Sequence, residues 1–124
     1  MKQNLVAWFE IPVSDMDRAK AFYEEVFKTT IDVQDFGGTM MGFFPSVKDG
    51  AGAMGSLIHH KQYVPSKEGV LIYFNCEDVE TEMARVEAEG GNVLQPKTLI
   101  SPATGYMAVI LDTEGNRIAL YSHT

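Results

Sequence analysis

The first half of the chain reads as one strand, one helix and three further strands. Residues 5–13 are rich in β-branched and aromatic side chains, which is typical of a strand. Apolar side chains then recur at helical spacing after Ser14 and Asp15, whose side-chain oxygens can cap a helix N-terminus. Beyond Lys28 the apolar runs are short and glycine-rich turns separate them. This pattern predicts strands at residues 30–33, 40–44 and 54–58.

The second half repeats this order. Residues 70–76 read as a strand, Asp78 offers an acidic cap, and Gly90-Gly91 marks the end of a second helix. The run between Asp112 and Asn116 has the composition of a hairpin turn. We therefore expect strands at residues 92–94, 106–111 and 117–121, with a long loop over residues 97–106.

A shift of 63 residues superimposes the two halves, placing Asp15 on Asp78 and Val13 on Cys76. Few letters are identical, so the repeat is one of pattern. The pattern predicts one α+β domain over residues 1–124 that contains two βαβββ modules, at about 1–62 and 66–124. An α+β sandwich without internal symmetry is the alternative.

Composition narrows the classes of partner and compartment. The chain has 45% hydrophobic and 22% charged residues, which is ordinary for a globular domain. A net charge of -7 repels phosphate backbones, so we expect no nucleic-acid partner. No apolar run approaches the roughly 18–20 residues that a membrane span needs, and the N-terminus does not resemble a signal peptide. Cys76 is the single cysteine, which fits a cytoplasmic protein.

Three stretches in the same order resemble one known family. They are the run from Phe9 to Phe27, the run from Asp78 to Gly91, and the closing hairpin from Asp112 to Leu120. Together they resemble the vicinal-oxygen-chelate superfamily, which includes glyoxalase I, bleomycin-resistance proteins and extradiol dioxygenases. The resemblance implies a curled, partly open mixed sheet around a cup, with the helices outside. It also implies that two modules form one site, either within a chain or across a homodimer.

The family's chemistry uses a divalent metal bound by His or Glu side chains from the first and last strands of the modules. In this sequence those positions fall at Trp8, at Leu71, at Ala119, and near Gly55 or Ser56. A divalent metal needs several oxygens or imidazoles that converge at about 2.0–2.5 Å. Trp, Leu and Ala offer none, so we expect no metal at the inherited site and no cofactor.

A relocated metal site is the alternative. His59 and His60 are adjacent, so on a strand they face opposite sides and only one of them can join Glu10. His123 lies next to the end of the sequence and is expected at the surface.

Strand alternation then predicts what the cup holds. If Trp8 faces inward, so does Glu10, which could act as a general base if burial raised its pKa, or could lie at the rim beside a cation. Aromatic side chains in this position can also simply fill the core. The expected ligand-binding residues are Trp8, Ser56, Tyr73, Asn75 and Tyr121, around Glu10 as the catalytic candidate.

These residues support three functions. The first is a metal-free protein, akin to the bleomycin-resistance proteins but not expected to bind bleomycin itself, that binds a small organic molecule in an aromatic cup as a homodimer. The second is a lyase, isomerase or dioxygenase of the superfamily type, either metal-free with Glu10 as the base or with a relocated metal. The third is a partner-binding module whose cup is filled by its own side chains.

Overall fold

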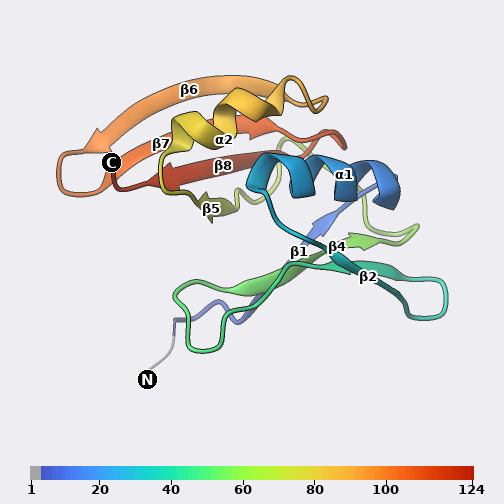
Figure 1. Ribbon diagram of the computed structural model, residues 1–124. Helices are drawn as coiled ribbons and strands as arrows, with labels where there is room; N and C mark the ends of the chain where they lie inside the picture. Colours follow the sequence, from blue (N-terminus) through green and yellow to red (C-terminus); the bar gives the residue numbers. More distant parts are fainter. Residues whose placement is uncertain (1–3) are drawn as a thin grey trace.

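The computed structural model describes residues 4–124 as two modules, each with one helix on one face of a four-stranded sheet (Figure 1). Sheet one, formed by the first half of the chain, occupies the lower part of Figure 1. Sheet two, formed by the second half, occupies the upper part. This is the tandem βαβββ architecture expected from the sequence, with neither sheet closed into a barrel.

Module one contains one helix and four strands, and most of their bounds lie close to the sequence-based expectation. The elements are β1 (Trp8–Pro12), α1 (Met16–Phe27), β2 (Asp32–Asp35), β3 (Met40–Phe43) and β4 (Met54–His59).

Module two repeats this order. The elements are β5 (Tyr73–Asn75), α2 (Val79–Val86), β6 (Asn92–Ser101), β7 (Gly105–Leu111) and β8 (Arg117–Ser122). Among residues 4–124, no helix is long and apolar enough to cross a membrane.

The two sheets have the same topology. Their strand orders are β1-β4-β3-β2 and β5-β8-β7-β6, with a parallel first pair and antiparallel pairs after it. Glu10 pairs with Ser56 in sheet one, and Tyr73 pairs with Ala119 in sheet two. Tyr73 lies 63 residues after Glu10, and Ala119 lies 63 residues after Ser56. Each helix also begins after an aspartate N-cap, so the repeat predicted from the sequence is confirmed.

One core joins the modules. The helix-facing side chains of both sheets pack with α1 and α2 into a single apolar cluster. The opposite face of each sheet therefore leads away from this shared core, and we call it the open face. Fully buried members of the cluster include Phe22, Tyr23, Leu57, Val79, Val86, Ile110 and Leu120.

A buried carboxylate from module two caps the helix of module one. Glu114 Oε1 accepts hydrogen bonds from the backbone N–H groups of Ser14 and Asp15, each at 2.8 Å. Arg18 donates from Nε to Glu114 Oε2 at 2.7 Å, and the Glu114 side chain is fully buried. The negative charge lies at the positive end of the helix dipole, where it is stabilised.

A second set of polar contacts links the two modules. The Tyr23 hydroxyl donates to Asp112 Oδ2 at 2.6 Å in the buried interior. Asn116 donates from Nδ2 to Asp112 and to the carbonyl of Pro12, at 3.1 and 2.6 Å. Asn116 Oδ1 accepts from the backbone of Ser66 at 3.0 Å. These bonds fix the hairpin of module two against the first strand of module one.

The long loop expected at residues 97–106 is wrong, because β6 extends through most of it to Ser101. Pro96, Pro102 and Gly105 gave the segment the composition of a loop, and its pairing with β7 contains register shifts. An edge strand tolerates both features, since its outer backbone groups need no partner strand. At β5 the error is opposite, because only Tyr73–Asn75 of the expected residues 70–76 pair as a strand.

Candidate functional site

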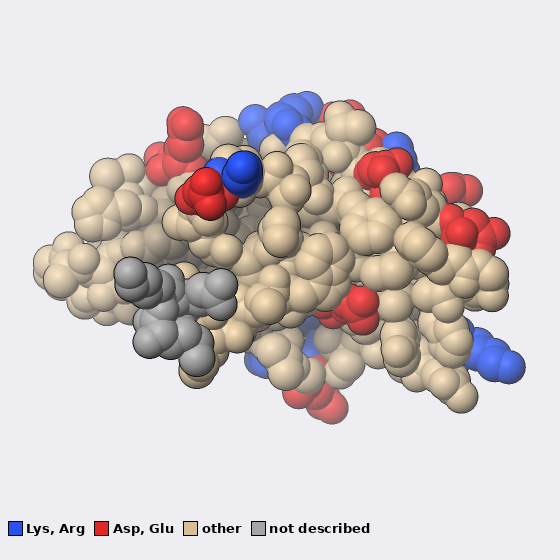
Figure 2. Space-filling view, turned by 90° about the horizontal axis from the view of Figure 1, so that it is seen from below, with Lys and Arg blue, Asp and Glu red and all other residues tan. Residues whose placement is uncertain are grey.

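The open face of sheet one carries a group of aromatic and methionine side chains. Trp8 packs edge-to-face on Phe43, with ring centroids 5.9 Å apart, and Phe36 packs on the same ring at 6.2 Å. Trp8 is 40% exposed and Met54, on the neighbouring strand, is 49% exposed. In the view from below, the surface is mostly free of charged side chains (Figure 2). This face therefore offers apolar area and ring surfaces to a ligand.

Glu10 and Ser56 lie side by side on the same face, as cross-strand partners. Ser56 is fully buried, and its hydroxyl has no hydrogen-bond partner among residues 4–124. Glu10 is exposed in the single chain, so burial of its carboxylate requires a second chain or a ligand. Glu10 lines a hollow of about 300 Å³ together with Pro12, Ile58, Tyr63 and Val64.

The open face of sheet two carries the remaining predicted residues. Tyr73 and Asn75 come from β5, beside Ala119 and Tyr121 of β8. The Tyr121 hydroxyl donates to the carbonyl of Thr104, so it is occupied within the chain.

Arg117 lies on the same face at the start of β8. It donates from Nη2 to the carbonyl of Gly69 at 3.3 Å. Its Nε is buried without a partner among the described residues. Sequence analysis did not include Arg117 in the site, although strand alternation places it on the same face as Tyr121.

The structure thus divides the predicted cup into two halves. Trp8, Glu10 and Ser56 lie on the open face of sheet one, and Tyr73, Asn75 and Tyr121 lie on that of sheet two. Both faces lead away from the core that joins the sheets. A single chain therefore does not bring the two groups together around one ligand.

A wider opening lies between the modules, and we call it the inter-module cleft. It measures about 1420 Å³ and is bordered by the starts of β1 and β5 and by the loop at residues 45–53. Tyr73 and Asn75 lie at its edge. Sequence analysis missed this cleft, because the contact between modules that shapes it leaves no local pattern.

Comparison with known proteins places the chain in a family. The sequence profile of the Glyoxalase/Bleomycin resistance protein/Dioxygenase superfamily matches residues 5–120. The chain belongs to this superfamily. No curated relative was found by sequence comparison.

Three solved structures illustrate the range of superfamily members with this fold. TnmS3, an antibiotic binding protein from a Streptomyces species, is 26% identical over 100% of this chain and 99% of its own, with a TM-score of 0.67. A glyoxalase/bleomycin resistance protein from Albidiferax ferrireducens is 16% identical, with coverages of 98% and 100% and a TM-score of 0.72. A glyoxalase I mutant from Zea mays is 16% identical, with a TM-score of 0.74. The match covers 94% of this chain but only 45% of the maize chain, so this chain spans about half of that protein.

The residues at the superfamily's metal positions do not fit a metal. Trp8, Ser56 and Ala119 occupy the open faces at those positions, and Leu71 lies just before β5. Apolar side chains and one neutral hydroxyl do not make the donor set that Zn²⁺, Ni²⁺, Fe²⁺ or Mn²⁺ requires. Within residues 4–124, no group of three or more His, Cys, Asp or Glu side chains could hold a metal ion.

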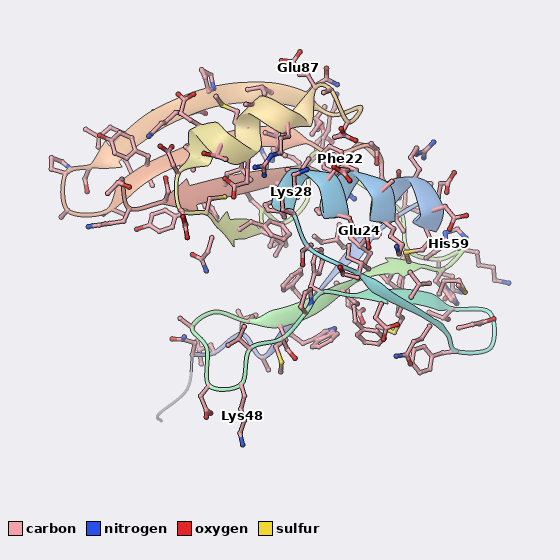
Figure 3. The ribbon with its side chains drawn as sticks, in the orientation of Figure 1. Phe22, Glu24, Lys28, Lys48, His59 and Glu87 are labelled. Atoms are coloured by element: carbon pink, nitrogen blue, oxygen red, sulfur yellow. The ribbon has the colours of Figure 1, made fainter. Side chains whose placement is uncertain are left out.

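The histidines near this superfamily site are held by local contacts. His59 lies on the helix-facing side of β4, and its Nδ1 is 2.9 Å from the carbonyl oxygen of Val13. Glu10 is on the open face, so the sheet separates the two side chains. His60 accepts from the backbone N–H of Gln62 at 3.1 Å. His59 is visible at the end of β4 in Figure 3, away from the loop that carries Lys48.

Cys76 is placed as a small core side chain. It packs against the shared core, and burial, assisted by the nearby carboxylate of Glu82, raises the pKa of its thiol to about 12. A thiol with so high a pKa is almost entirely protonated at neutral pH, which makes it a poor nucleophile.

Proposed function

We propose that this protein binds a small, flat or amphipathic organic molecule without a metal, in a cup that two copies of the chain form together. In this arrangement the open face of sheet one of one copy meets the open face of sheet two of the other. The residues that contact the ligand are then Trp8, Ser56, Tyr73, Asn75 and Tyr121, with Glu10 beside them.

The aromatic surface around Trp8 is the observation that carries this proposal. Trp8 is 40% exposed and Phe43 is half-buried on this face in the described part of the chain. Side chains of this kind contribute apolar area for affinity, while Glu10 and the unpartnered Ser56 hydroxyl can orient the ligand. The similarity to TnmS3 over the whole chain supports a binding role, since that relative is an antibiotic binding protein. A cytoplasmic location, consistent with the single cysteine, is part of the proposal.

A lyase or isomerase that uses Glu10 as general base is the second candidate. It is favoured by the neighbouring carboxylate and unpartnered hydroxyl of Glu10 and Ser56, which could share a proton of a bound substrate. This candidate requires the second chain to bury Glu10. A panel of α-hydroxy carbonyl substrates and thiol hemiacetals, assayed with wild type and Glu10→Gln, separates catalysis from binding.

Ligand binding can be followed directly, because Trp8 is the only tryptophan in the chain. A library of planar aromatic compounds is titrated while the Trp8 emission is recorded. We expect at least one compound to quench Trp8 and to bind at least about tenfold more weakly to Ser56→Ala, which removes the hydroxyl and adds no atom to this fully buried position. Ser14→Ala serves as the matched control, because Ser14 is exposed and lines neither the hollow beside Glu10 nor the inter-module cleft. If no compound changes the emission of Trp8, the cup is not a ligand site.

The metal-free part of the proposal has its own test. Metal content is measured by plasma mass spectrometry on wild type and Glu10→Ala. We expect far less than one equivalent in both proteins, and no change in melting temperature when Ni²⁺, Zn²⁺, Mn²⁺ or Fe²⁺ is added. Stoichiometric metal that is lost in Glu10→Ala would contradict the proposal and would support a relocated site.

A further inference from the structure

The strands of the two sheets carry opposite charges. In the described part of the chain, β1 to β4 contain Glu10, Asp32 and Asp35 and neither lysine nor arginine. β5 to β8 contain Lys97 and Arg117 and neither aspartate nor glutamate. The whole chain has 17 acidic and 10 basic residues, so an even distribution would place acidic side chains on both sheets.

The open faces share this separation of charge. Glu10 lies on the open face of sheet one. Arg117 lies on the open face of sheet two, because its neighbour Ile118 is buried in the shared core. Lys97 turns towards α2, where its Nζ pairs with the N-cap Asp78 at 3.0 Å. The strands therefore contribute a carboxylate to one open face and a guanidinium to the other.

Glu10 has no partner of opposite charge in its own chain. Its side chain is exposed, and it forms no ion pair with a lysine, arginine or histidine of residues 4–124. It borders the hollow of about 300 Å³ on the open face. The carboxylate is therefore accessible to a group from a second chain.

Arg117 has no carboxylate partner either. The residue is half-buried, and within residues 4–124 its guanidinium makes one hydrogen bond, from Nη2 to the carbonyl of Gly69 at 3.3 Å. Nε is buried without a partner in this part of the chain, whereas Nη1 is not among the buried atoms that lack one. A guanidinium that is partly removed from water is stabilised best by a carboxylate, which accepts two of its N–H groups.

Both charges lie close to the centres of their open faces. Ser56 and Ala119 are equivalent in the 63-residue repeat, and both are fully buried. Glu10 lies one strand from Ser56, which is about 4.8 Å, and Arg117 lies two residues before Ala119, which is about 6.6 Å along β8. When the two faces meet, the long side chains of Glu10 and Arg117 can reach each other across the cup.

From these observations we infer that Glu10 forms an ion pair with Arg117 of the partner subunit, and that this pair determines which faces meet in the dimer. The inference rests on the two-chain cup proposed above. A symmetric dimer contains the pair twice. Contact between two copies of sheet one would instead bring two Glu10 carboxylates together, and like charges at an interface repel. In the cup, Arg117 of the partner subunit is a positioning residue that holds the Glu10 carboxylate beside the ligand.

An exchange of the two charges tests the inference in the protein without ligand. Analytical ultracentrifugation measures the dissociation constant of the dimer for wild type, Glu10→Arg, Arg117→Glu and the double variant, which keeps the net charge of -7. We expect each single reversal to weaken the dimer at least about tenfold, because like charges then face each other. The double variant should return to within about threefold of wild type, because the two substitutions are coupled.

Glu87→Arg is the matched control. It makes the same change in charge at an exposed residue next to α2, on the side of module two that faces away from sheet one (Figure 3), and should leave the dimer unchanged. Circular dichroism verifies that each variant is folded. If a reversal prevents folding, Glu10→Gln, Arg117→Gln and their combination form a second cycle. In that cycle the combined loss should equal the loss in either variant alone.

The results separate this inference from the proposed function. A dimer that is unaffected by both single reversals would overturn the ion pair and leave the two-chain cup in place. That result is also expected if Arg117 binds an anionic group of the ligand instead of Glu10. Additive losses in the double variant would overturn the pair as well. A monomeric wild type would overturn both the pair and the two-chain cup.

Discussion

At the scale of single residues, two buried polar groups from the last hairpin hold the modules in place. Asp112 accepts from Tyr23 and Asn116, and Glu114 caps the first helix. Asp112 lies 89 positions from Tyr23, and Glu114 lies 100 and 99 positions from Ser14 and Asp15. Their removal therefore affects the docking of the modules more than the stability of either module's local structure.

The Tyr23 hydroxyl can be removed with little change in volume. Tyr23→Phe deprives the buried Asp112 of its shortest hydrogen bond, and we expect a loss of about 1–3 kcal/mol in the free energy of unfolding. Burial raises the pKa of Asp112, and the remaining bonds from Asn116 only partly offset this. Urea denaturation checks the result, with exposed Tyr63→Phe as the control. A loss of less than about 0.5 kcal/mol would show that the hydroxyl contributes little.

Glu114 makes the stability depend on acidic pH. Burial alone would raise the pKa of Glu114, but the ion pair with Arg18 and the bonds from Asp15 and Ser14 outweigh it and hold the pKa below its ordinary 4.5. A carboxyl whose pKa is lower in the folded state stabilises the fold above its unfolded pKa. That contribution is lost as the pH falls through the folded pKa.

We therefore expect wild type to lose stability as the pH falls below about 4.5, and Glu114→Gln to lose less over the same range. Asp112 works in the opposite sense, because its raised pKa makes protonation favour the folded state. Asp112→Asn should accordingly steepen the loss of stability in acid. Urea midpoints measured from about pH 7 down to about pH 3 test both signs. Parallel pH profiles for wild type and Glu114→Gln would remove Glu114 as the cause.

At the scale of elements, the absence of a side chain at Gly55 of β4 leaves room for the ring of Phe9 on the neighbouring strand β1. A Cβ built on Gly55 would lie 2.5 Å from the ring of Phe9. The Phe9 ring also packs against the rings of Phe44 and Phe74, which restrict its movement on the helix-facing side of sheet one. Gly55 is thus required by a close approach of side chain to backbone, not by its own dihedral angles.

Gly55→Ala should displace Phe9 towards the inter-module cleft. We expect a loss of about 1–3 kcal/mol in the free energy of unfolding, as for overpacking elsewhere. Gly69→Ala is the matched control, because its added Cβ meets nothing nearer than 3.9 Å. Thermal and urea unfolding of both variants measure the difference. Equal stability of the two variants would mean that Phe9 moves without cost.

At the scale of the whole molecule, each module leaves one face and one strand edge uncovered. β1 and β5 are edge strands within the described part of the chain, and apolar side chains at or near them remain exposed. Exposed edges and apolar patches of this kind are typical of surfaces that pair with another chain. The proposed homodimer covers both at once.

The dimer can be tested by mass in solution. We expect analytical ultracentrifugation to give twice the 13.7 kDa of one chain. Tyr73→Glu, which adds a charge at the edge strand of sheet two, should shift the equilibrium towards the monomer. Leu94→Glu is the control, because Leu94 is equally exposed, at 51%, but lies on the opposite edge strand β6. A monomeric wild type would leave the two halves of the cup apart.

The sequence by itself determined the local order of the fold. Alternating and helical periods predicted both helices and the order of the eight strands, although β5 is shorter and β6 longer than expected. The aspartate caps at Asp15 and Asp78 revealed the 63-residue repeat. Strand alternation also assigned Trp8 and Glu10 to one face, because neighbouring side chains on a strand point to opposite sides. These features depend on residues close together in the chain.

Only the tertiary structure decided how the two modules pack together and in which directions their open faces point. Packing of both helices into one core turned the open faces away from each other, so the predicted cup residues fall into two groups within a chain. It also created the inter-module cleft, to which both modules contribute. β6 continued past Pro96 because β7 supplied a partner strand. Each of these depends on contacts between residues far apart in sequence, for which local periodicity holds no signal.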